Sequence, residues 1–117
     1  MTRINVVPPS ELTRQHLVAE YRELPRIFKL ARRCKDAPEQ YKLGSGHMKF
    51  FFDKLEYLVN RQQALIDEML RRGYSPKHTD AQSLRMLCDD EGLYNDYIPT
   101  PHALKLNRER IQERLNG

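Results

Sequence analysis

Hydrophobic residues recur at helical spacing in the first third of the chain. At about 100° per residue, one side of a helix there carries Leu17, Tyr21, Leu24, Phe28 and Ala31. The other side carries His16, Glu20, Arg22, Glu23 and Arg26. This pattern predicts a helix capped by Ser10 and running to about Cys34, with one packed face and one charged face. Pro25 lacks a backbone donor, so we expect a kink or a break close to Glu23.

A longer pattern occupies the middle of the chain, where core positions recur at intervals of four and three. These positions are Phe51, Leu55, Leu58, Gln62, Leu65 and Met69. Their spacing predicts the central core helix. Gly73 follows Arg71 and Arg72 and supplies a left-handed stop. The three side chains of Phe50–Phe52 are expected to pack in the core rather than to form a platform for stacked bases.

The remaining segments are predicted to be loops, short helices and one last helix. Pro8-Pro9 make residues 1–9 an extended arm, and residues 35–43 form a loop. A short helix is expected over Ala81–Leu87, followed at residues 93–99 by an irregular aromatic strip. Thr100 as N-cap and Pro101 at the first position begin a last helix. Its few apolar positions are Leu104, Ile111 and Leu115.

These elements place the chain in the all-α class. With 117 residues it has material for one core but not for two, so we expect a compact single domain over residues 1–117. It would have about three main helices, the extended arm and long irregular connections. No apolar run approaches the roughly 20 residues that cross a bilayer, and the N-terminus lacks a signal-peptide core. We therefore expect a soluble, cytoplasmic protein with no membrane contact, in which Cys34 and Cys88 are ordinary thiols.

Positive charge is concentrated near the N-terminus. The net charge is +4, but residues 1–35 hold eight Lys or Arg residues against three Glu residues. The rest of the chain holds twelve basic and thirteen acidic residues. A positive patch confined to one segment is typical of a protein that binds a polyanion. The pattern does not distinguish DNA, RNA and an acidic protein.

The charged face of the first helix is the strongest candidate site. Such a face is commonly only solvated. In this case Arg22 and Arg26, at i and i+4, reinforce each other around one carboxylate, Glu23. The sequence has no Gly-rich phosphate loop, no Ser/His/Asp or Cys/His signature and no His/Cys cluster with metal-ligand spacing. We therefore expect neither a metal nor a cofactor.

A nucleophile is available at the N-terminus. A free lysine is almost wholly protonated at neutral pH, whereas an α-amino group, with a reference pKa of about 7.7–8.0, is roughly a tenth neutral. Removal of Met1 would present the amine of Thr2 on the short arm. Arg3, Arg22 and Arg26 would lower the pKa of that amine by like-charge repulsion.

Several short segments carry a further signal. They are Met1–Asn5, Glu11–Leu12, Gln15–Leu17, Ala19–Arg26, Gly46–His47, Phe50–Phe51, Asp53–Glu56 and Asp96–Pro99. Together they resemble the bacteriophage endonuclease V family of pyrimidine-dimer DNA glycosylases with AP-lyase activity. The resemblance spans most of the chain and is most specific in its N-terminal portion.

The resemblance implies a compact helical domain that kinks damaged double-stranded DNA, binds it largely from the minor-groove side and flips a nucleotide out of the stack. It implies that the amine of Thr2 attacks C1′ of the damaged nucleoside to give an imine. It further implies that Glu23 stabilises positive charge on the sugar and assists the β-elimination that cuts the strand. The residues that match DNA-binding positions are Arg3, Gln15, His16, Arg22 and Arg26. An amine, a carboxylate and arginines suit these roles chemically.

We therefore interpret the chain as a DNA repair glycosylase and AP lyase that acts as a monomer on damaged DNA. The alternatives are a lyase or glycosylase for another lesion, a non-catalytic DNA-binding module, and a helical protein that binds an acidic partner. The sequence has no Trp, whereas the family's C-terminal tail, linked to dimer recognition, is rich in Trp, Tyr and Lys. We expect ready cleavage at abasic sites. We also expect a smaller preference for dimer-containing over undamaged DNA than longer members of the family show. Tyr94 and Tyr97 are expected either to support disturbed bases or to pack in the core.

Overall fold

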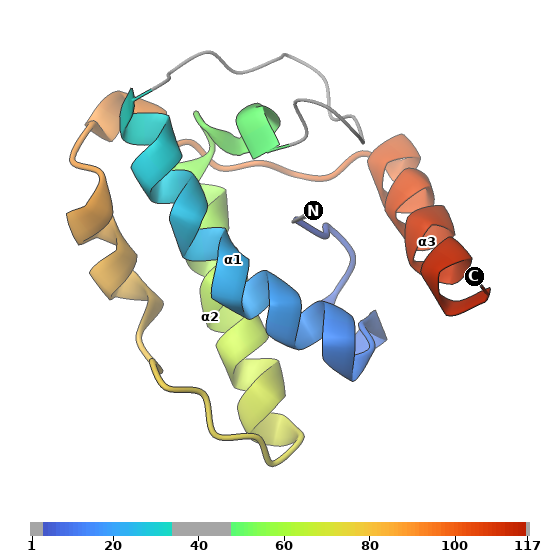
Figure 1. Ribbon diagram of the computed structural model, residues 1–117. Coiled ribbons are helices and arrows are strands. Elements are labelled where there is room, and N and C mark those ends of the chain that lie inside the picture. The colour runs from blue at the N-terminus through green and yellow to red at the C-terminus, as the bar shows by residue number, and fades with distance from the viewer. Residues whose placement is uncertain (1–3, 34–47, 117) are drawn as a thin grey trace.

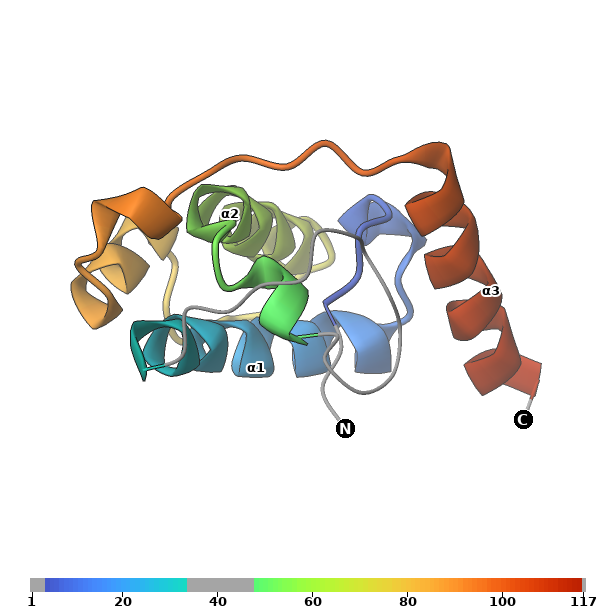
Figure 2. The same cartoon turned by 90° about the horizontal axis from the view of Figure 1, so that it is seen from above.

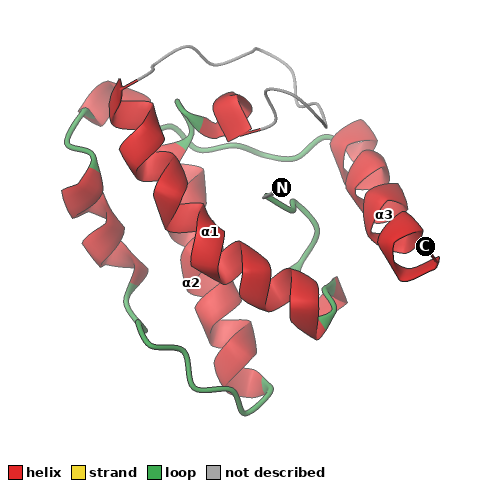
Figure 3. Cartoon of the chain, in the orientation of Figure 1, coloured by secondary structure: helices red, strands yellow, loops and turns green. Residues whose placement is uncertain are grey.

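The computed structural model describes residues 4–33 and 48–116, and every regular element in them is helical (Figure 3). The α-helices are α1 (Arg14–Arg33), α2 (Leu55–Arg71) and α3 (Pro101–Asn116). The 3₁₀ helices are η1 (Pro9–Glu11), η2 (Met48–Phe51), η3 (Ala81–Leu87) and η4 (Glu91–Leu93). The all-α prediction is confirmed. The predicted loop over residues 35–43 lies outside the described residues.

The helices α1 and α2 pack against each other, and η3 packs on both. Figures 1 and 2 show that the N-terminal segment lies between this helix pair and α3. Residues 4–7 are all buried, so this part of the predicted arm is packed inside the fold. The three Phe side chains of residues 50–52 are also buried, which confirms their predicted role in packing.

The helix α1 begins later than the sequence predicted, because Thr13 and not Ser10 is its cap. The hydroxyl oxygen of Thr13 accepts a hydrogen bond from the backbone N–H of His16 at 3.2 Å. It also lies 2.7 Å from Nδ1 of the same histidine. Ser10 belongs instead to η1, a separate turn that starts at Pro9.

Pro25 bends α1 without breaking it. A kink or a break was expected here, and the structure has the kink: the helix is continuous through Pro25, and Figure 1 shows a bend near its middle. Proline leaves the carbonyl of Tyr21, four residues earlier, without its helical donor. Gln62 of α2 supplies a replacement, because its Nε2 donates to the oxygen of Tyr21 at 3.1 Å.

The predicted helix ends at Gly73 and Thr100 are confirmed. Gly73 has a φ of +86°, and the N–H of Tyr74 donates to the carbonyl of Met69 at 2.8 Å, as in a Schellman motif. At the start of α3, Oγ1 of Thr100 accepts from the N–H of Ala103 at 3.1 Å. No helix among the described residues is long and apolar enough to span a bilayer.

The aromatic strip at residues 93–99 packs against the core. The ring of Tyr97 lies 5.1 Å from that of Phe50 and 5.3 Å from that of Tyr57, both edge-on. The hydroxyl of Tyr94 donates to the carbonyl of Cys88 at 2.7 Å. Packing is therefore the confirmed use of both strip tyrosines, and Cys88 is a buried free thiol.

Candidate functional site

The predicted site residues that the structure describes share one side of α1. With about 3.6 residues per turn, they occupy a sector of about 120° that faces away from α2. We call this side the outer strip; it consists of Gln15, His16, Ala19, Arg22, Glu23, Arg26 and Lys29. His16 and Glu23 are partly buried and the other members are exposed. Thr2 and Arg3 lie outside the described residues.

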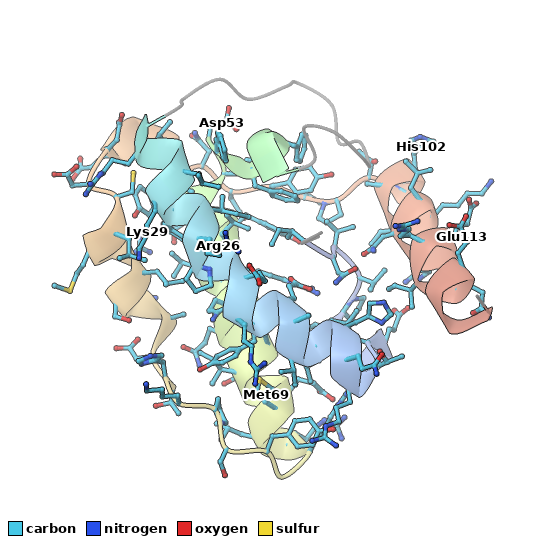
Figure 4. All side chains as sticks on the ribbon, in the orientation of Figure 1. Arg26, Lys29, Asp53, Met69, His102 and Glu113 are labelled. Atoms are coloured by element: carbon cyan, nitrogen blue, oxygen red, sulfur yellow. The ribbon has the colours of Figure 1, made fainter. Side chains whose placement is uncertain are left out.

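A charged pair stands at the centre of the outer strip. Nη1 of Arg26 lies 2.7 Å from Oε2 of Glu23, one helical turn away. The Arg26 side chain is 68% exposed and that of Glu23 is 32% exposed. Arg22 makes no ion pair with any described residue. Figure 4 shows Arg26 and Lys29 on α1, so with Arg22 three exposed cations share the outer strip with the Glu23 carboxylate.

A buried ion pair lies beneath the outer strip. Glu20, which is 1% exposed, accepts hydrogen bonds from Nε of Arg61 at 2.8 Å and from Nη2 at 3.1 Å. The prediction that Glu20 belongs to the charged outer face is therefore wrong. A signal was present, because Glu20 and Arg61 each lie at the edge of an apolar helix face. Opposite charges at two such edges can pair when the faces pack.

The buried ion pair also holds the arm. Nδ2 of Asn5 donates to Oε1 of Glu20 at 2.9 Å. Nη1 of Arg61 donates to the carbonyl oxygen of Val7. Ile4 is fully buried, and it immediately precedes Asn5. Because Glu20 lies one turn of α1 before Glu23, the arm enters the fold beside the centre of the outer strip.

Asn107 of α3 holds the arm from the opposite side. Its Oδ1 accepts from the backbone N–H of Val6 at 2.6 Å and of Val7 at 3.1 Å. Its Nδ2 donates to Oδ1 of Asn5 at 2.8 Å. This role of Asn107 was not predicted from the sequence. The one hint of its burial is that it lies on the same side of the last helix as Leu104.

A hollow of about 630 Å³ lies between α1, α2 and residues 75–87. On α1 it is lined by Val18, Tyr21, Arg22 and Pro25. Glu23 does not line the hollow, so its carboxylate lies outside it, with the side chain 32% exposed. The hollow is also lined by Gln62, whose buried Oε1 has no hydrogen-bond partner in the described part of the chain.

This arrangement suits chemistry on a large anionic substrate. Exposed guanidinium and ammonium groups bind phosphates, and a carboxylate between them can stabilise a positive charge that forms on the bound molecule. Among residues 4–33 and 48–116, no group of three or more His, Cys, Asp or Glu side chains is arranged to hold a metal ion.

A sequence model of the family described as pyrimidine dimer DNA glycosylase matches residues 1–82. The match covers the arm, α1 and α2, and with them every residue of the outer strip. It also covers both members of the buried ion pair. The helix α3, which carries Asn107, lies beyond the matched residues.

Proposed function

Because the chain belongs to the pyrimidine dimer DNA glycosylase family, we propose that it is also an AP lyase whose nucleophile is the amine of Thr2. The family match makes the chain a DNA repair glycosylase that acts on damaged DNA. The proposal adds the covalent mechanism, the cyclobutane pyrimidine dimer as the lesion, and action as a monomer on double-stranded DNA inside the cell.

The observation that carries the proposal is the anchoring of the arm beside Glu20. An extended chain spans at most about 3.6 Å per residue, so the amine of Thr2 is restricted to within about 7 Å of Ile4. Glu20 and Glu23 are three residues apart on α1, a rise of about 4.5 Å along the helix axis. The length of the arm therefore supports a reaction between the Thr2 amine and a sugar bound at Glu23.

In the proposed reaction, the neutral amine forms a bond to C1′ of the damaged nucleotide. The C1′–base bond breaks, and its electron pair leaves with the base, which takes up a proton. A proton then passes from the bound nitrogen to O4′ as the sugar ring opens, which leaves a protonated imine. Removal of a proton from C2′ expels the 3′ phosphate and cuts the strand. Water finally hydrolyses the imine and restores the amine.

The outer strip supplies the remaining groups. The Glu23 carboxylate stabilises the positive charge that develops on the sugar and assists removal of the C2′ proton. Arg22 and Arg26 bind phosphates on either side of the damaged nucleotide, and Arg3 joins them from the arm. Gln15 and His16 contact the DNA at the N-terminal end of the strip.

Borohydride trapping tests the nucleophile, because reduction converts an imine into a stable covalent bond. Protein that begins at Thr2, mixed with duplex DNA containing an abasic site, should yield an adduct on its N-terminal peptide in mass spectrometry. One residue appended before Thr2 should abolish that adduct. An adduct mapped to Lys29 would show that the assignment of the nucleophile is wrong.

Single-turnover assays on abasic, dimer-containing and undamaged duplexes test the lesion. We expect rapid cleavage of the abasic duplex and incision of the dimer duplex, with a smaller difference in rate between dimer and undamaged DNA than longer members of the family show. Strong cleavage at the abasic site without any dimer incision would instead favour a lyase or glycosylase for another lesion.

A further inference from the structure

We propose that Asn107 of α3 is a positioning residue, which fixes the arm so that the Thr2 amine meets the sugar held at Glu23. This inference rests on the proposed function. It concerns a helix that lies outside the family match and that covers the arm on the side opposite α1 and α2 (Figure 1).

Asn107 fixes the backbone of the arm. Val6 and Val7 belong to no helix or strand, and both are buried. Buried N–H groups without partners are costly, so each needs an acceptor. The oxygen of one side chain, Asn107, accepts from both. Two successive N–H groups bound to one atom define the position of the chain and also its direction.

Asn107 is also connected to α1, the helix that carries the outer strip. Asn5 connects Asn107 on one side of the arm to Glu20 on the other. Its amide orientation is fixed, because its oxygen accepts from Asn107 while its nitrogen donates to the glutamate. An unbroken chain of buried polar groups therefore runs from α3 to α1, the helix that carries Glu23. Asn107 itself is 2% exposed.

The rate of a covalent reaction is sensitive to the placement of the reacting groups. Displacement of a reacting group by about 1 Å can lower the rate about 100-fold. Only one residue, Arg3, lies between Thr2 and the fully buried Ile4, so the position of the anchored arm limits the region that the amine can reach. Loss of the Asn107 contacts should consequently slow bond formation at C1′. It should leave DNA binding by the outer strip intact.

Two substitutions separate the contacts. Asn107→Leu has a similar shape and removes all three hydrogen bonds. Asn107→Asp retains an acceptor for Val6 and Val7 and loses only the donor to Asn5. We expect Asn107→Leu to lower the single-turnover trapping rate on saturating abasic duplex at least about tenfold, with DNA affinity within about twofold. Asn107→Asp should fall between this variant and the wild type.

Two controls address folding. Arg108→Ala removes the ion pair that joins α3 to Glu11, which lies outside the buried stretch of the arm. Leu84→Ala creates a cavity beneath η3, away from α3. Both should trap at close to the wild-type rate at a temperature where all variants are folded. Amide hydrogen exchange at Val6 and Val7 should accelerate in Asn107→Leu only.

The outcomes distinguish the two proposals. A wild-type protein without any N-terminal adduct would overturn the proposed function, and the role of Asn107 with it. A normal wild-type adduct with an unchanged trapping rate in folded Asn107→Leu would overturn the positioning role alone. The positioning role would also be overturned if Leu84→Ala slowed trapping as much as Asn107→Leu, because the rate would then follow stability.

Discussion

At the residue scale, Glu20 and Glu23 occupy successive turns of α1 but differ in burial and in partner. Glu20 is enclosed with Arg61, whereas Glu23 lies at the surface with Arg26. A buried charge that loses its partner costs about 3–5 kcal/mol, while an exposed ion pair contributes about 0.2–1 kcal/mol. Removing one negative charge should therefore have different consequences at the two positions.

Glu20→Gln should lower the free energy of unfolding by about 3–5 kcal/mol, because it leaves the Arg61 guanidinium buried without an anion. Glu23→Gln should change that free energy by less than about 1 kcal/mol. It should nearly eliminate strand cleavage and preserve DNA affinity, because the lost charge acts on the transition state. Denaturant unfolding, DNA titration and single-turnover cleavage measure the three quantities.

The assignment of the two carboxylates depends on comparing folded proteins. Both variants should be assayed at a temperature where unfolding curves show them native. If folded Glu23→Gln kept most of its cleavage activity, Glu23 would not be the carboxylate of the reaction.

At the scale of elements, side chains satisfy backbone groups that helix geometry leaves without partners. Gln62 bonds the carbonyl of Tyr21 where Pro25 interrupts α1. At the end of α2, Arg72 donates to the carbonyl of Leu12 at 2.8 Å and so holds the segment before α1. In each case a polar side chain in α2 or directly after it holds part of the N-terminal third of the chain.

The Gln62 contact should be coupled to Pro25. Gln62→Leu should cost about 1–3 kcal/mol in the free energy of unfolding, because the Tyr21 carbonyl loses its donor. In a Pro25→Ala background the restored N–H at position 25 can bond that carbonyl, so Gln62→Leu should cost less. A double-mutant cycle measured by denaturant unfolding tests this coupling. Equal costs in the two backgrounds would contradict it.

The end of α2 should make stability sensitive to acid. Hydrogen bonds from Arg71 and Arg72 lower the pKa of Glu68 from 4.5 to about 2. A lowered pKa contributes stability that is present above about pH 4.5 and is lost as the pH falls toward 2. The difference in melting temperature between the wild type and Glu68→Gln should therefore shrink across this range. A constant difference in melting temperature between the two proteins from pH 6 to about pH 2 would contradict the lowered pKa of Glu68.

The elements that the sequence predicted best are those with local signals. Residues within one or two helical turns determine the periodicity of α2, the stop at Gly73 and the cap at Thr100. The buried polar network escaped prediction because its partners lie far apart: Arg61 is 41 residues from Glu20, and Asn107 is 101 residues from Val6. Only their placement on apolar helix faces hinted at burial. The outer strip was predictable because all its members belong to a single helix.

At the scale of the whole molecule, charge is arranged in two layers. The outer strip faces solvent on the side of α1 away from α2, and Figure 1 shows α2 behind α1. Arg61 of α2 and Arg72, the residue after α2, pair instead with the buried carboxylates of Glu20 and Glu68. Cations of α1 without a buried partner are the ones available to DNA phosphates.

This arrangement predicts which arginines control the salt dependence of DNA binding. Each phosphate contact contributes about 0.9 to the slope of log affinity against log salt concentration. Arg22→Ala and Arg26→Ala should each weaken binding to duplex DNA and reduce the magnitude of this slope by about that amount. Arg71→Ala is the matched control, because it also removes one exposed cation but leaves Glu68 paired with Arg72. Its slope should equal that of the wild type. Titrations at several salt concentrations decide the matter. Unchanged slopes in both α1 variants would mean that these arginines serve the fold or the reaction and not phosphate binding.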